Sequence, residues 1–189
     1  LDSSTRRNLE LTETLREKQK RGSLLGVLDK TKTAMGARTL RQYIEQPLID
    51  KSEIEKRLDG ISELSEKAML RDEIREYLNP IYDLERLLGK VSYKTANPRD
   101  LLAFAGSLKM LPSIKVLLND FSSDILKKIQ EETDDLTDVC TLIERAICEE
   151  PPLAIREGGI IRDGFDENID RLRLSLIHIS EPTRQAEIS

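Results

Sequence analysis

The chain has 189 residues and a formal net charge of −5, with 34% charged residues, 4% aromatic residues and no tryptophan. This length allows one large domain, or a domain with an appendage. The acidic balance argues against a chain that grips nucleic acid by itself, because such binding needs clustered Lys and Arg. Many charges and few aromatic residues favour an elongated helical protein in which much of each helix faces water.

The charge is unevenly distributed along the chain. Residues 1–48 carry ten Lys or Arg against six Asp or Glu, whereas residues 131–150 carry eight acidic residues against one Arg. Solvated helix surface is the simpler interpretation of both segments. The alternative is that the basic segment lies near nucleic acid or an acidic neighbour.

The first expected element is a short strand over residues 8–11, where two leucines alternate with polar residues. Thr31 or Thr33 is expected to cap a helix that runs to about Gln46 and ends before Pro47. The apolar residues of this helix are Met35, Leu40, Tyr43 and Ile44.

The middle of the chain has the pattern of successive amphipathic helices. Ser52 and Glu55 have the spacing of a capping box, which opens a helix. The residues expected on the buried face of this helix are Ile54, Leu58, Ile61 and Leu64. Asn97 followed by Pro98 predicts another helix start, with proline at the first helical position. Further apolar stripes predict helices over residues 70–78, 81–91, 101–108, 114–121, 125–129 and 136–147.

The pattern changes after Pro151 and Pro152. Residues 153–166, LAIREGGIIRDGFD, alternate between apolar and polar residues around Gly158 and Gly159, which predicts a short hairpin or an extended loop. A charged amphipathic helix is then expected from Asp166, with Ile169 and Leu172 on its inward face.

No arrangement typical of an active site occurs in the sequence. The phosphate-binding pattern G-x-x-x-x-G-K-[ST] is absent. His178 is the single histidine, and it lies in an atypical C-terminal tail. A catalytic triad of a nucleophile, a histidine and an acid would have to use it as the base. The chain is therefore predicted not to be an enzyme, with no catalytic, cofactor-binding or metal-binding residues.

The two cysteines, Cys140 and Cys148, are eight residues apart. That spacing is too long for a disulfide within one helix and does not match a metal-binding pair. They are interpreted as small buried apolar groups in a reducing compartment. No signal peptide and no apolar run of membrane-spanning length is recognised in the sequence, which favours a cytoplasmic chain without a membrane partner.

Three stretches in order resemble one family. They are LDSSTRRNLEL at the start, LDKTKTAMGARTLRQYIEQPL from Leu28, and PPLAIREGGIIRDGFDENIDRLR from Pro151. Together with YDLERLLGKVSYKTANPRDL between them, they are similar to the core, or lever, domain of the MutS family of DNA mismatch-repair proteins. The resemblance covers residues 1–173.

The resemblance implies an all-α, irregular multi-helix bundle with a short strand or extended segment at each end. The implied divisions are a core domain over residues 1–165 and the start of a lever helix toward a clamp domain over residues 166–173. Residues 174–189, LSLIHISEPTRQAEIS, depart from the family pattern and resemble translated sequencing-adapter read-through. They are interpreted as a non-native, disordered tail, the alternative being a divergent natural C-terminus.

The family role implied for this domain is a connector between DNA binding and an ATPase. The mismatch reader, the clamp and the P-loop are expected outside this chain, so ATP and Mg²⁺ belong to the missing ATPase domain. The implied partners are mismatched double-stranded DNA through the parent protein, a second parent subunit and a MutL-type repair protein. The implied location is the bacterial cytoplasm, with association to the nucleoid when on DNA.

The residues that carry the family signature are expected to be structural. They are Arg7, Asn8, Leu9, Leu28, Thr33, Met35, Gly36, Arg38, Pro47, Leu48, Gly158, Gly159 and Gly164. Gly36 is expected to permit close packing inside the multidomain body, the alternative being a helix N-terminus that any small residue would suit. Gly158 and Gly159 are expected to form the pivot of the lever.

Two other functional classes remain open from the sequence. One is a free-standing helical protein-interaction module with the same fold. The other is an autonomous DNA-binding domain that uses the basic first segment, which the net charge of −5 disfavours.

Overall fold

The computed structural model of the chain describes residues 3–152 and 155–175. These residues contain ten named α-helices, a 3-10 helix, η1, over Ile155–Glu157, and a helical segment over residues 167–175. The α-helices are α1 Ser3–Asn8, α2 Leu24–Leu28, α3 Ala34–Glu45, α4 Lys51–Glu66, α5 Ala68–Leu78, α6 Leu84–Ser92, α7 Pro98–Leu108, α8 Leu111–Leu118, α9 Asp124–Glu132 and α10 Thr137–Ala146. Because these same residues contain no strand, the predicted all-α class is confirmed.

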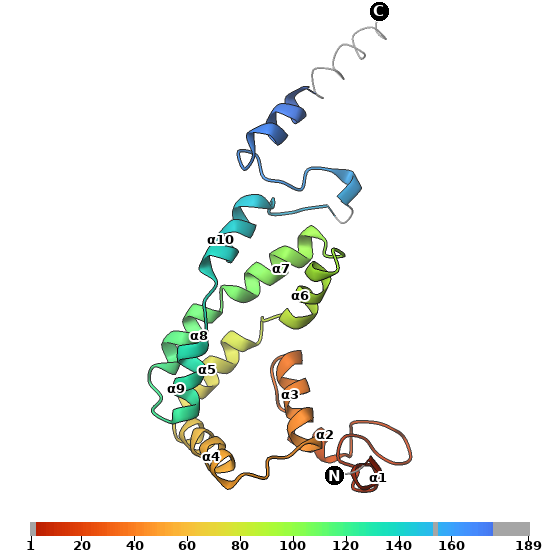
Figure 1. Ribbon diagram of the computed structural model, residues 1–189, viewed down its shortest axis with the longest axis vertical. Helices are drawn as coiled ribbons and strands as arrows, with labels where there is room; N and C mark the ends of the chain where they lie inside the picture. The colour runs from red at the N-terminus through yellow and green to blue at the C-terminus, as the bar shows by residue number, and fades with distance from the viewer. Residues whose placement is uncertain (1–2, 153–154, 176–189) are drawn as a thin grey trace, which may run out of the picture.

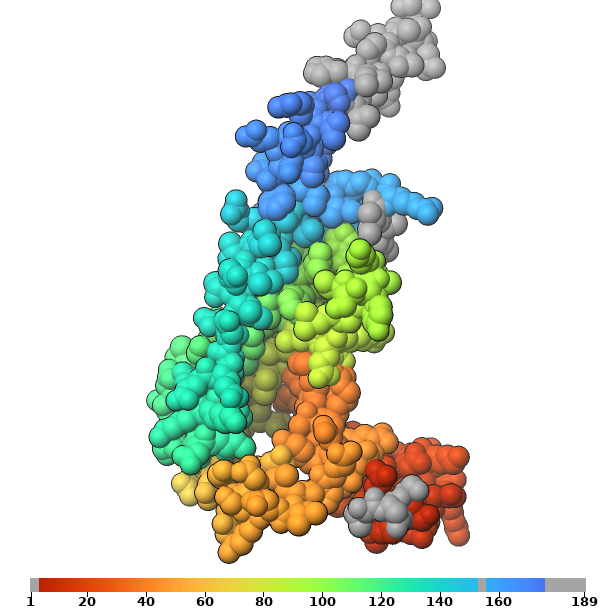
Figure 2. All heavy atoms as spheres, viewed as in Figure 1, coloured from red at the N-terminus to blue at the C-terminus, as the bar shows by residue number. Residues whose placement is uncertain are grey.

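The helices form an elongated column (Figure 1). Helix α4 lies at one end, α5, α8 and α9 form the middle, and α6, α7 and α10 lie toward the other end. Helices α1, α2 and α3 lie beside the column near α4, and the helical segment 167–175 projects beyond α10 (Figure 2). This shape accords with the composition, because an elongated bundle leaves much of each helix in water.

The core of the column is divided into two hydrophobic clusters. The first cluster consists of Ile81, Ile114, Leu118, Phe121 and Leu126. The second cluster consists of Leu87, Phe104, Ala105, Leu108 and Cys140. Leu84, in the first turn of α6, is the one described residue that packs against both clusters. The two clusters therefore follow one another along the column.

A close contact joins α4 to α9 in the first half of the column. Gly60 is the buried residue of α4, and a Cβ added to it would lie 2.5 Å from Cγ2 of Ile125. Nearby, the Glu63 carboxylate accepts hydrogen bonds from the backbone N–H groups of Ser122 at 2.7 Å and Ser123 at 2.8 Å. A side chain of α4 thus binds the donors that precede the first turn of α9.

Local capping signals in the sequence are confirmed at two helix starts. The Thr33 side chain accepts a hydrogen bond from the Gly36 N–H at 3.0 Å and begins α3. Asn97 and Asp100 form a reciprocal capping box, with Pro98 as the first residue of α7. These signals succeed because each involves residues within one helical turn.

Two other local predictions are wrong. The strand expected over residues 8–11 is replaced by the end of α1 and a turn, in which the Leu9 N–H donates to the Thr5 carbonyl at 3.0 Å. The capping box expected at Ser52 and Glu55 does not form, because α4 begins two residues earlier. Its cap is Asp50, which accepts a hydrogen bond from the Glu53 N–H at 3.0 Å.

The predicted buried face of α4 is wrong for three of its four residues. Ile54, Leu58 and Ile61 are 37%, 56% and 61% exposed, and Leu64 alone of this set packs against the first cluster. The helix turns the side that carries Gly60 toward α9 instead. The periodic pattern identified an apolar stripe, but no described element of this chain covers it.

The sequence was expected to contain no apolar run long enough to span a membrane, and this expectation is wrong when only length and composition are considered. Within the described part of the chain, one helical stretch, Pro98–Leu118, is long and apolar enough to cross a membrane. The core helix of a water-soluble protein meets the same criteria, and this stretch supplies Phe104, Leu108, Ile114 and Leu118 to the two clusters. The burial of these side chains against neighbouring helices accounts for the apolar composition.

Both cysteines are free thiols. Cys140 is buried in the second cluster and donates a weak hydrogen bond to the Ala105 carbonyl at 3.5 Å. Burial raises the pKa of the Cys140 thiol, which keeps it protonated and unreactive. Cys148 is only half-buried, so the prediction of a buried apolar group is confirmed for Cys140 alone.

Among the aspartates in the first half of the chain, Asp29 and Asp83 have pKa values below the usual range. Hydrogen bonds from the Lys20 and Thr31 side chains lower the pKa of Asp29 to about 2. The Arg38 guanidinium lowers the pKa of Asp83. Both carboxylates are therefore held in the charged form by their donors.

The free energy of unfolding is expected to fall as the pH is lowered from about 4 toward 2. Aspartates in the unfolded chain take up protons near pH 3.9, whereas these folded carboxylates do so only at lower pH, so acid favours the unfolded state. Urea unfolding followed by circular dichroism at a series of pH values measures this slope. In Asp83→Asn the slope should be shallower, and equal stability at about pH 5 and pH 2.5 would contradict the assignment.

Candidate functional site: the junction before the C-terminal helix

The segment that follows α10 is tied back to the end of that helix. Ile147 and Ile161 form an isolated antiparallel bridge. The Cys148 N–H donates to the Ile160 carbonyl at 2.9 Å, and the Arg162 N–H donates to the Ala146 carbonyl at 2.8 Å. Because Ile147 is 5% exposed, the bridge is anchored in the body of the column. Residues 160–162 are therefore fixed to the end of α10.

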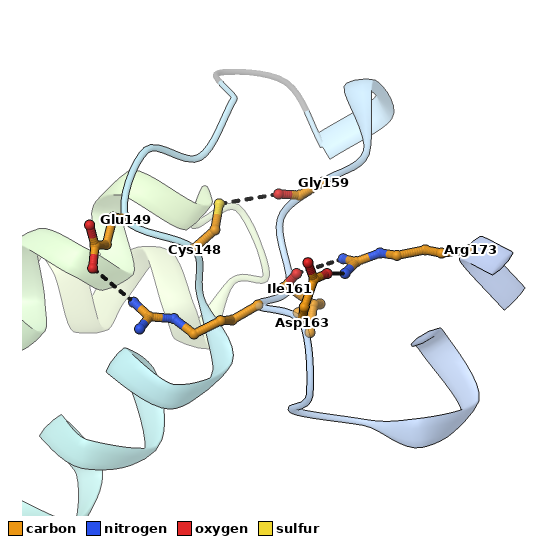
Figure 3. A pocket seen from close by; sticks show the side chains of 7 residues that line it. Cys148, Glu149, Gly159, Ile161, Asp163 and Arg173 are labelled. Carbon is orange, nitrogen blue, oxygen red and sulfur yellow. Dashed lines mark hydrogen bonds and ion pairs between the residues drawn. The ribbon is translucent and has the colours of Figure 1, made fainter. Parts of the chain in front are cut away.

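The pair Gly158 and Gly159 lies between η1 and this bridge. Both residues have a left-handed backbone conformation, with φ of 73° and 68°, which residues other than glycine rarely adopt. The Cys148 thiol donates to the Gly159 carbonyl at 3.1 Å (Figure 3). The described part of this segment, residues 155–166, is an irregular loop that begins with η1 rather than an extended one. The hairpin alternative is wrong, because the partner of Ile161 is Ile147 and not a residue on the other side of the glycines.

A tight turn over residues 163–166 leads from the bridge into the C-terminal helix. Gly164 has a left-handed φ of 79°, and its N–H donates to Oδ2 of Asp170 at 2.9 Å. Asp166 caps the helix by accepting from the N–H groups of Asn168 at 2.9 Å and Ile169 at 3.2 Å. The predicted start of a helix at Asp166 is confirmed.

The predicted inward face of this helix is wrong in part. Ile169 is half-buried, but Leu172 is 64% exposed and Leu174 is 60% exposed. Two of the apolar residues in the helical segment 167–175 therefore lie in solvent rather than against the bundle. Polar contacts made by Arg173 attach this helix to the residues that precede it.

Arg173 connects the C-terminal helix to the bridge (Figure 3). Its guanidinium donates to the Ile161 carbonyl at 2.5 Å and forms an ion pair with Asp163. A second carboxylate, Asp170, lies 3.8 Å away on the preceding turn of the same helix. The side chain of Arg173 is only 30% exposed. One arginine thus spans from the helix to both the bridge and the turn.

A shallow depression lies beside this network (Figure 3). Its lining consists of Cys148, Glu149, Gly159, Ile161, Arg162, Asp163 and Arg173. Arg162 and Glu149 form an ion pair across it at 3.7 Å. Within residues 3–152 and 155–175, no group of three or more His, Cys, Asp or Glu side chains could hold a metal ion. His178 lies outside the described residues.

The signature residues at the start of the chain lie far from the junction (Figure 1). Arg7 and Asn8 end α1, and Leu9 follows at 58% exposure. Leu28 ends α2 and is 49% exposed, and Pro47 lies with Leu48 in the linker between α3 and α4. The structure therefore does not gather these residues into one site.

Gly36 lies in the first turn of α3. The three heavy atoms nearest to a Cβ added there would belong to Thr33 and Thr31, the closest being Thr33 Oγ1 at 3.1 Å. These neighbours belong to the cap of the same helix, which fits the alternative of a small residue at a helix N-terminus. Met35, its neighbour, packs against the first cluster.

Arg38 has a defined partner across the fold. Its guanidinium donates to both carboxylate oxygens of Asp83, at 2.7 and 2.8 Å, and to Glu85 at 3.0 Å. Asp83 is the cap of α6. Because no residue of α3 is buried, this network contributes to holding α3 beside the column.

Two residues that organise the molecule were not among those predicted. Arg173 has no signal in the sequence apart from its place one turn after Asp170 and ten residues after Asp163. Gly60 has a clear signal, since it interrupts the 16-residue helix α4 at a position where glycine costs about 1 kcal/mol relative to alanine.

The chain is similar in sequence to known proteins over most of its length. The family described as MutS domain III matches residues 4–188. The DNA mismatch repair protein MutS of Lachnoclostridium phytofermentans is 67% identical over 92% of this chain, and that of Ruminiclostridium cellulolyticum is 55% identical over 94%. The chain spans 19% and 20% of the lengths of these relatives. The chain therefore belongs to the MutS domain III family.

Proposed function

We propose that this chain is the lever, or connector, of a MutS-type mismatch-repair protein, and that it transmits changes between a DNA-binding end and an ATPase. The observation that carries the proposal is the junction itself. A helix leaves the end of an elongated column through a fixed bridge, a tight turn and one arginine. A helix advances about 1.5 Å per residue and is stiff, so a small rotation at its base becomes a large displacement farther along.

The rest of the proposed role belongs to the parent protein. The relatives are named as DNA mismatch repair proteins, and this chain corresponds to about a fifth of their length. We assign no catalytic step to the chain. ATP with Mg²⁺, mismatched duplex DNA, a second parent subunit and a MutL-type protein would be bound by other regions or by the assembled protein, in the bacterial cytoplasm or on the nucleoid.

The lever proposal predicts that flexibility placed at the junction uncouples the two ends. In a full-length relative, three glycines inserted after the residue equivalent to Gly164 should reduce the effect of ATP on DNA affinity by at least about fivefold, since coupling free energies commonly correspond to 5- to 150-fold effects. DNA affinity without nucleotide and ATP hydrolysis without DNA should not change. Fluorescence anisotropy of labelled duplex DNA, with and without ATP, measures the effect.

The matched control is the same insertion after the residue equivalent to Lys94, in the exposed loop between α6 and α7. Exposed loops tolerate such insertions, and this loop does not lie between the bridge and the C-terminal helix. Coupling should persist there. Full coupling after the insertion at Gly164 would show that the junction carries no signal and would refute the lever role.

A further inference from the structure

The bridge divides the junction into two parts with different mechanical consequences. Gly158 and Gly159 precede the bridge, whereas residues 163–166 follow it. Two backbone hydrogen bonds hold residues 160 and 162 to the end of α10. A backbone change at the glycine pair is therefore stopped at the bridge before it reaches the C-terminal helix. A change within residues 163–166 reaches the helix directly.

The turn after the bridge has the features of a movable joint. Gly164 adopts φ of 79°, and a Cβ added there would meet no heavy atom within 4 Å. Its N–H is bonded to Asp170 in the helix, and the Phe165 N–H donates to the Arg162 carbonyl at 3.3 Å. Open space around a glycine allows its backbone to change without moving neighbouring groups.

Arg173 is placed to set the direction of the helix. It contacts the Ile161 carbonyl at the bridge, the Asp163 carboxylate at the turn and Asp170 in the helix. Leu172 and Leu174 are exposed, so their side chains do not fix the helix on the column. The guanidinium has a rigid fork that binds two acceptors in fixed directions, which suits this bridging position.

We propose that the C-terminal helix pivots about residues 163–166 and that Arg173 is the positioning residue that fixes its direction. Gly158 and Gly159 are a left-handed connection that lets the chain return to the bridge, and they are not the pivot. The geometric proposal concerns this chain alone. Its consequence for coupling rests on the lever function proposed above.

The pivot is tested by measuring the helix direction in the 189-residue chain. Spin labels are attached at Leu142→Cys on α10 and Leu172→Cys on the C-terminal helix, both exposed positions, after Cys140→Ala and Cys148→Ser remove the native thiols. Double electron–electron resonance gives the distribution of the label separation. A swing of roughly 20° would move Leu172, the sixth residue of the segment, by about 3 Å, since each residue advances about 1.5 Å.

Arg173→Gln removes the positive charge and the forked donor group, and it should broaden or shift the distribution by about 3 Å. Arg171→Gln is the matched control: it makes the same change in the same helix at an exposed arginine for which no partner is found among the described residues. That variant, and the pair Gly158→Ala with Gly159→Ala, should leave the distribution unchanged. An unchanged distribution in Arg173→Gln, or an equal change in the glycine variant, would overturn the pivot.

A second pair of labels, at Leu88→Cys on α6 and Leu142→Cys on α10, verifies that the column is intact in every variant. Both positions are exposed, at 50% and 56%. If Arg173→Gln broadens only the first distribution, the change is confined to the helix. If it broadens both, the arginine stabilises the column as a whole and the positioning role is wrong.

The same substitution in a full-length relative separates this inference from the lever function. If Arg173→Gln changes the direction of the helix but leaves the effect of ATP on DNA affinity normal, the pivot is confirmed and the lever function is refuted. If the effect of ATP on DNA affinity weakens while the direction of the helix is unchanged, the lever function stands and the pivot is refuted. Loss of both the fixed direction and the coupling is the result expected if both proposals hold.

Discussion

Replacing Leu108 with alanine is expected to destabilise the chain by about 2–5 kcal/mol. Leu108 is 2% exposed at the end of α7 and lies in the second cluster with Phe104 and Cys140. The substitution removes buried methyl groups and leaves a cavity that the surrounding helices fill only in part. Urea unfolding monitored by circular dichroism measures the change in the free energy of unfolding.

The matched control is Leu88→Ala, in α6. This leucine is 50% exposed, so the same truncation removes groups that already contact water. The expected loss is below about 1 kcal/mol. Equal losses in the two variants would mean that the second cluster does not form the core of this half of the column.

Replacing Gly60 with valine is expected to destabilise the chain by about 2–3 kcal/mol, because the added atoms overfill the contact between α4 and α9. A Cβ at this position would lie 2.5 Å from Cγ2 of Ile125, closer than real Cβ contacts. Ile125 cannot easily turn away, since its β-branched side chain has few rotamers and packs against the first cluster.

Gly106→Val provides the control for this prediction. Gly106 also lies inside a helix, α7, but a Cβ added there would meet no heavy atom within 4 Å. Helix propensity slightly favours valine over glycine, so the expected change in stability is within about 0.5 kcal/mol. A loss at Gly106 as large as the loss at Gly60 would show that the cost arises from the side chain in the helix, not from the contact with α9.

The contrast between Gly36 and Gly60 shows which glycine signals can be interpreted from a sequence. Gly36 follows Thr33 by three residues, which is the spacing of a capped first turn, and the structure places it there. Gly60 lies ten residues after the cap Asp50, so helix capping does not explain it. A glycine in the interior of a helix carries a cost in helix propensity, and close approach of another element offsets that cost.

The amphipathic pattern predicted elements better than it predicted their partners. The starts of α3 and α7 were correct, because their caps involve residues within one turn. Ile54, Leu58 and Ile61 do form an apolar stripe on α4, but the stripe is exposed. Periodicity shows that a helix face is apolar, and it does not show which element covers that face. The pairing of Ile147 with Ile161 was missed because it joins residues separated by an irregular segment.

The contacts of Leu84 bear on how cooperatively the column unfolds. The two hydrophobic clusters are consecutive, and this half-buried side chain touches both. Native proteins open in cooperative units that follow their packing, so each cluster defines one such unit. Amide protons in α9 and in α10 would then report separate opening reactions. Leu84 joins these reactions, and the strength of its two contacts sets how far opening in one half of the column lowers the protection of the other.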